Sequence, residues 1–115
     1  MTEIAEFLHL VGQLDEVEVL EHSRYSKLVV SGHTFGYLWE PTRTVGLKQT
    51  LAEQAALVAE RPEVFEVQFT AGGFGWVVVQ LGGVDRRELA ELTFEAWRLT
   101  APAMLVDERG ERLPS

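Results

Sequence analysis

Cysteine is absent from the 115-residue chain, which excludes a disulfide framework and a thiolate metal site. Long apolar runs are also missing. Runs such as Trp76–Val79 fall far short of the roughly 20 residues that a membrane helix needs. The chain opens on a polar helical pattern, where an export signal would be basic and apolar. We therefore expect a cytoplasmic protein that does not span a membrane.

Basic residues are scarce: 10 Lys and Arg stand against 18 Asp and Glu, giving a net charge of -8 and a pI near 4.8. Only Arg86 and Arg87 are adjacent, so the sequence shows no basic stripe. Nonspecific nucleic-acid binding depends on Lys and Arg displacing counterions from phosphates. The composition therefore disfavours a nucleic-acid partner.

No catalytic or metal-binding arrangement is visible in the sequence. The three histidines are widely separated and lack metal-ligand spacing with a carboxylate. The glycines of 72–75 join two predicted strands, whereas a phosphate-binding loop joins a strand to a helix. Ser23, Ser26 and Ser31 lack the strand-to-helix turn of a hydrolase nucleophile. We predict no catalytic residue, no metal and no cofactor, and expect that the protein is not an enzyme.

The first third of the chain predicts a helix and then a hairpin. Helical spacing runs from Thr2, its expected cap, to Gly12. The segment Gln13–Ser26 is interpreted as a loop, with a strand over 16–21 left open. Strands Lys27–Ser31 and Thr34–Trp39 follow, joined by a two-residue type II′ turn at 32–33.

The rest of the chain repeats these signals. Thr50 with Glu53 forms a capping box, Asp85 with Glu88 forms another, and Pro62 and Pro102 end the two helices. The polar segment Asp107–Ser115 is expected to be a flexible tail. The predicted strands are Arg43–Lys48, Phe65–Thr70 and Gly75–Leu81, the last two joined at Gly72–Gly73.

Alternation within the hairpins predicts two sheet faces. The predicted pairs are Val30 with Phe35, Leu28 with Tyr37, Phe69 with Trp76 and Val67 with Val78. The first face is expected to lie under the helices and contains Leu28, Val30, Phe35, Tyr37, Trp39, Phe69 and Trp76. The other is an unusually apolar outer face, and monomers seldom expose such patches. That outer face contains Val29, Leu38, Val77, Val79 and Leu81.

These elements predict one α+β domain over residues 1–115. It has two layers, with an antiparallel sheet of two hairpin units and helices on one face, in the order α-β-β-β-α-β-β-α. The hairpins favour the antiparallel arrangement because parallel strands need long crossover connections.

The chain resembles the MmcQ/YjbR family across roughly residues 19–105. The resemblance is carried by LVVSGHTFGYLWE, VGLK, RPEVF, TAGGFGWVVVQL and LAELTFEAWRLTAP in that order. It implies an α/β fold with strands in a double-wing arrangement and a DNA-binding role, in a family whose biochemical role is undefined. The chain departs from the family at His33, where many members carry Lys, and at 73–75, where basic or histidine residues are common.

Two binding hypotheses follow. In the first, suggested by the resemblance and disfavoured by the net charge, Arg43, Lys48 and Trp76 contact DNA, the aromatic ring by stacking. In the alternative, the apolar outer face (Val29, Leu38, Val77, Val79 and Leu81) binds a protein partner or a second subunit without nucleic acid.

Overall fold

A computed structural model describes residues 2–115 and contains a single six-stranded antiparallel sheet. The strand order across the sheet is β1-β2-β3-β4-β6-β5. No helix in this part of the chain is long and apolar enough to cross a membrane. The elements are α1 (Ile4–Gly12), β1 (Val17–Glu21), β2 (Ser26–Val30), β3 (His33–Trp39), β4 (Thr44–Thr50), α2 (Leu51–Glu60), β5 (Phe65–Ala71), β6 (Phe74–Gln80), a 3-10 turn (Leu81–Gly83), α3 (Arg86–Arg98) and α4 (Ala103–Arg109).

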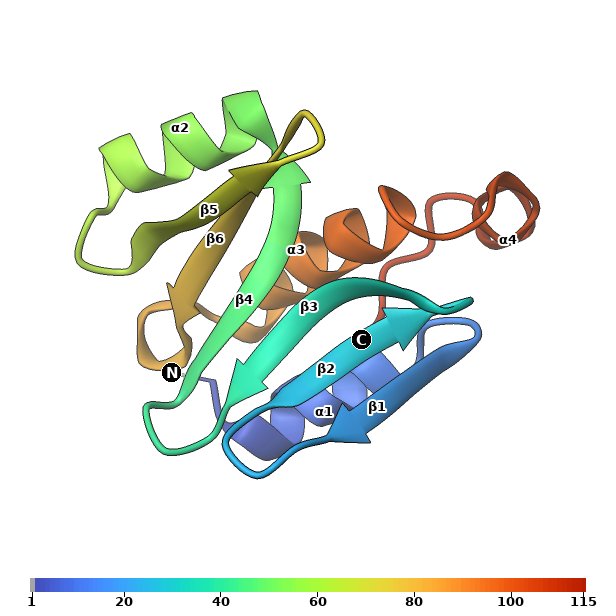
Figure 1. Cartoon of the computed structure of the whole chain (residues 1–115), viewed down its shortest axis with the longest axis horizontal. Helices are drawn as coiled ribbons and strands as arrows, with labels where there is room; N and C mark the ends of the chain where they lie inside the picture. Colours follow the sequence, from blue (N-terminus) through green and yellow to red (C-terminus); the bar gives the residue numbers. More distant parts are fainter. Residues whose placement is uncertain (1) are drawn as a thin grey trace.

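The helices and the sheet form the two predicted layers. Helices α1 and α3 pack against each other behind the strands, and α2 packs against β5 and β6 (Figure 1). Between the layers lies one hydrophobic core, in which Trp97, Phe7 and Phe35 are among the largest fully buried side chains. The opposite face of the sheet carries no helix among residues 2–115 (Figure 1). This uncovered side is called the open face below.

The capping box predicted at α2 is confirmed, whereas at α3 only the Asp85 half is present, because the Glu88 carboxylate pairs with Arg61. The Thr50 hydroxyl accepts from the Glu53 amide at 3.1 Å, and the Asp85 carboxylate accepts from the Glu88 amide at 2.8 Å. Both side chains satisfy amides that the first helical turn leaves without partners. The start of α1 differs: its cap is Glu3, while buried Thr2 donates instead to the Val84 carbonyl oxygen at 2.8 Å.

The segment left open between loop and strand forms β1, an edge strand paired with β2. The order of elements in the chain is therefore α-β-β-β-β-α-β-β-α-α, with one strand and one helix more than predicted.

The additional helix is α4, near the C-terminus. Arg109, at its end, is buried and donates to the Gln13 carbonyl oxygen at 2.9 Å. The flexible tail expected from Asp107 is thus wrong, since Leu113 also packs on the core and Pro114 is buried.

A bulge in β3 overturns the predicted register of the first hairpin. The turn occupies Ser31–Gly32, both at positive φ, so Val30 pairs with His33. Leu28 then pairs with Gly36, which leaves Phe35 without a partner in β2. One extra residue in a strand reverses which face the following side chains occupy. Phe35 remains buried, but Leu38 replaces Tyr37 on the core side.

The second hairpin has the predicted turn and a second bulge. Phe69 pairs with Trp76 as predicted, but Gln68 is skipped, so Val67 pairs with Val77 and not with Val78. Gln54 of α2 compensates this irregularity, because its amide donates to the carbonyl oxygens of Phe69 and Trp76 at 3.2 and 2.9 Å. The helix can approach so closely because Gly75 lacks a Cβ, which would lie 2.7 Å from the Gln54 Cβ.

The predicted outer face is therefore wrong. β4 pairs with β6 so that Val45 faces Val79 and Leu47 faces Val77, all four within the core beneath the helices. Two neighbouring residues, Leu38 and Leu81, are buried in the same cluster. Val29 is 5% exposed and, as the neighbour of the core residues Leu28 and Val30 along β2, lies on the opposite side. None of the five forms an exposed apolar surface.

A carboxylate at the α2–α3 contact makes stability depend on pH. Burial raises the pKa of Glu95, Glu53 of α2 raises it further, and the neighbouring Arg98 opposes the shift. A carboxyl group with a raised pKa in the native state stabilises the fold at pH values below its unfolded pKa of about 4.3. This contribution to stability is lost as the pH rises through the native pKa. We expect Glu95→Gln to retain more of its stability than the wild type when the pH is raised from 4 to 7.

Chemical denaturation at the two pH values tests this expectation. Glu91→Gln is the matched control, because Glu91 lies on the same helix and its side chain is 56% exposed in a surface pair with Arg87. Equal pH dependence in wild type and Glu95→Gln would contradict the assignment of this group.

Candidate functional site

Aromatic side chains form a continuous cluster on the open face. The rings of Tyr37 and Trp76 lie 5.7 Å apart between centroids, Trp76 stacks on Phe69 at 5.1 Å, and Tyr37 stacks on Trp39 at 5.8 Å. Tyr25 joins through Tyr37 at 6.1 Å. The cluster thus reaches from β5 through β6 and β3 to the β1–β2 turn. It is called the aromatic face below and consists of Tyr25, Tyr37, Trp39, Phe69 and Trp76.

The aromatic face is partly open to solvent. Trp76 at its centre is 7% exposed, whereas Phe69 at the edge is 38% exposed and the other three rings are half-buried. Buried aromatic clusters normally belong to a core. Here the core lies on the other side of the sheet, so the rings present apolar surface that no element of residues 2–115 covers.

Gly46 of β4 forms the floor of the aromatic face. A Cβ at this position would lie 3.0 Å from Trp39 Cη2 and closer still to Gln68 Oε1. The absence of a side chain therefore lets Trp39 and the bulged Gln68 meet over the backbone of β4. Gln68 Oε1 is buried there without a hydrogen-bond partner in residues 2–115. The platform is consequently built from close contacts that a larger residue would break.

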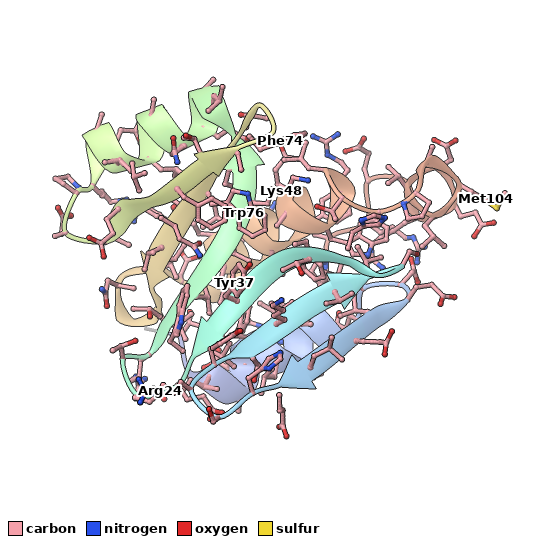
Figure 2. The ribbon with its side chains drawn as sticks, viewed as in Figure 1. Arg24, Tyr37, Lys48, Phe74, Trp76 and Met104 are labelled. Atoms are coloured by element: carbon pink, nitrogen blue, oxygen red, sulfur yellow. The ribbon has the colours of Figure 1, made fainter. Side chains whose placement is uncertain are left out.

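Lysines border the aromatic face. Lys48 pairs in register with Trp76, and its ammonium lies 4.1 Å from the centroid of the Phe74 ring. Lys27 pairs in register with Tyr37. Burial lowers the pKa of Lys48. Figure 2 shows Phe74, Lys48, Trp76 and Tyr37 in succession along this side of the sheet.

These lysines are among the few cations without an acidic partner. Six of the ten Lys and Arg side chains form ion pairs within residues 2–115. Of the remaining four, Lys27 and Lys48 border the aromatic face and Arg24 lies beside Tyr25 in the β1–β2 turn. The fourth, Arg112, lies beyond α4. The unpaired positive charge is therefore concentrated on and beside the open face.

Comparison with known proteins places the chain in a family. The family model described as YjbR matches residues 13–99, which is most of the chain. The chain belongs to the YjbR family. The resemblance derived from the sequence motifs is thereby confirmed. No curated protein matches the chain.

A solved structure supports the same fold. The YjbR-family chain is similar to Deinococcus radiodurans protein DR2400, described as a DUF419 domain, with a TM-score of 0.75 and 16% identity. The match covers 86% of this chain and 78% of the other. At this identity the likeness describes the architecture alone.

In this YjbR-family domain, the residues predicted for DNA contact separate into two places. Lys48 and Trp76 lie side by side on the open face. Arg43 lies in the β3–β4 turn, where it binds the Glu3 carboxylate at 2.8 Å. Among residues 2–115 no group of three His, Asp or Glu side chains is placed to hold a metal.

Strict alternation places most of the aromatic face in the core, and this prediction is wrong. The rings predicted beneath the helices lie on the open face together with Lys48; they are Tyr37, Trp39, Phe69 and Trp76. One signal could have placed Trp76 correctly: Lys48 and Gly46 alternate with the core residues Val45 and Leu47. Whatever pairs with Lys48 must share its side of the sheet. No comparable pattern in the sequence indicates that Lys27 and Gln68 lie on the open face.

Proposed function

We propose that this YjbR-family domain is a binding module, not an enzyme, and that its aromatic face binds unpaired bases of single-stranded nucleic acid. The observation that carries the proposal is the run of partly exposed rings around buried Trp76, bordered by Lys27 and Lys48 on a sheet face without helices. Single-strand binding modules combine such rings, on which bases stack, with cations that contact the backbone.

Charge favours a single strand over a duplex for this surface. Duplex binding relies on many phosphate contacts, and six of the ten cations are already ion-paired. The edge strands also place Glu18 and Glu66 on the open side, opposite Val29 and Val78. Stacking instead uses the faces of the rings and contributes about 1–3 kcal/mol per base. An acidic domain can therefore hold unpaired bases with few phosphate contacts.

The alternative partner surface, made of Val29, Leu38, Val77, Val79 and Leu81, has no support as it was placed. All five side chains are buried, four of them in the core. A protein partner has no access to them in the folded chain. The binding surface that we propose is the aromatic face, and its ligand is single-stranded nucleic acid.

Binding of a ten-nucleotide single strand, followed by fluorescence anisotropy, tests the proposal. We expect its dissociation constant to be at least about tenfold below that of the duplex of the same sequence, since one stacked base contributes that much. The duplex itself is expected to bind at about 10⁻⁴ M or more weakly. With at most three free cations near the face, the logarithmic salt slope should be no steeper than about -2.

Two variants locate the binding surface. Lys48→Ala is expected to weaken single-strand binding and to flatten the salt slope. Arg43→Ala is the matched control, because Arg43 is ion-paired with Glu3 away from the aromatic face, and it should leave both quantities unchanged. Duplex binding that is submicromolar and lost in both variants would refute the proposal and favour a duplex-binding domain.

A further inference from the structure

A pocket at one end of the sheet adjoins the aromatic face. It lies between the β1–β2 turn and the β3–β4 turn and has a volume of about 240 Å³. Its lining residues include Arg24, Ser23, Ser26 and His22, whose side chains carry a guanidinium, two hydroxyls and an imidazole. These are the donor types that proteins use for phosphate. Figure 2 shows Arg24 at this end, beyond Tyr37.

The guanidinium in this pocket has no acidic partner. Six other cations of residues 2–115 pair with carboxylates, but Arg24 has none within ion-pair distance. Arginine recognises phosphate through two parallel N–H donors, a geometry that an ion pair would block. The Arg24 donors are therefore available to a ligand.

Aromatic contacts connect the pocket to the aromatic face. His22 and Tyr25, both in the pocket wall, stack at 4.8 Å between ring centroids. Tyr25 contacts Tyr37, and Tyr37 contacts Trp76 at the centre of the sheet. These contacts form a continuous series of rings from Trp76 to Tyr25, the residue next to Arg24.

We propose that this pocket binds a phosphomonoester and that, on the proposed function, the phosphate is the terminal group of the stacked strand. A terminal phosphate carries up to two charges and three acceptor oxygens, more than an internal phosphodiester offers. Glu40 also lines the pocket and opposes an anion there. Its carboxylate provides a sensitive test, because its removal should strengthen phosphate binding.

The experiment compares three ten-nucleotide strands with the full chain: one with a 5′-phosphate, one with a 3′-phosphate and one with neither. We expect one phosphorylated strand to bind about tenfold tighter than the unphosphorylated strand, as a charge-assisted contact to arginine would give. Arg24→Gln should abolish this gain, and Glu40→Gln should increase it. Arg112→Gln is the control, since Arg112 also lacks an ion pair but lies beyond α4.

The outcomes separate the two proposals. Equal binding of all three strands, or a gain that persists in Arg24→Gln, overturns the phosphate site and leaves single-strand binding intact. Inorganic phosphate alone is the second probe, followed through the Ser23 and Arg24 amide resonances. If no strand binds but phosphate shifts these resonances, the proposed function fails and the phosphate site stands. If neither strand nor phosphate acts on the pocket, both fail.

Discussion

The double substitution Val77→Glu, Val79→Glu is expected to leave the chain unfolded. Both side chains are 0% exposed and pack in the core between the sheet and the helices. A buried carboxylate without a partner costs several kcal/mol even after relaxation. Two such charges exceed or match the 5–15 kcal/mol that holds a typical domain together. Circular dichroism should show loss of secondary structure. Light scattering should not show a dimer converted into a folded monomer.

A matched pair on the sheet edges controls for the added charge. Val19 and Val67 lie on β1 and β5 and are 41% and 54% exposed. Val19→Glu, Val67→Glu should remain folded, with a loss within about 1 kcal/mol, since exposed substitutions have small effects. If the Val77 and Val79 variant stayed folded with an unchanged melting temperature, the two valines would have to lie at the surface.

Local signals in the sequence predicted the architecture well. The capping box of α2, the Asp85 cap of α3, both helix-ending prolines and the Gly72–Gly73 turn depend on neighbouring residues alone, and each lies where predicted. Such features are decided within a few residues, so the pattern of the sequence is sufficient. The fold class, with its antiparallel sheet and helices on one face, follows from their order.

The faces of the sheet could not be predicted in the same way. Each hairpin contains a one-residue bulge, at Phe35 in β3 and at Gln68 in β5. Strict alternation assigns every residue beyond a bulge to the wrong side. Neither bulge has a sequence signature. The carbonyl oxygens beside the β5 bulge accept from the Gln54 amide of α2, a residue 15 or more positions away in the sequence.

The candidate site was predicted in fragments for the same reason. The chemistry of Lys48 and Trp76 predicts a shared contact surface, and the two residues do lie together. The surrounding rings of Tyr37, Trp39 and Phe69 are not predicted, because alternation without a bulge places them in the core. Arg43 lies elsewhere, since its ion pair with Glu3 joins residues 40 positions apart in the sequence.

Truncation of Phe35 to alanine is expected to lower the free energy of unfolding by about 3–5 kcal/mol, as for other fully buried aromatic side chains. Phe35 is 0% exposed and lies at the bulge where β3 changes the side that its residues present. Its removal leaves a cavity in the core at the position of the bulge. Denaturant titration of the wild type and the variant measures the difference.

Tyr37→Ala provides the comparison that tests the bulge itself. Without a bulge, Phe35 and Tyr37 share one face and both truncations should cost about as much. With it, Tyr37 lies half-buried on the open face, in contact with Trp39 and Trp76. Its loss should therefore cost only about 1–2 kcal/mol, within the range of ordinary substitutions. Equal losses for the two variants, or a loss below about 1 kcal/mol for Phe35→Ala, would contradict the observed register and place the aromatic face back beneath the helices.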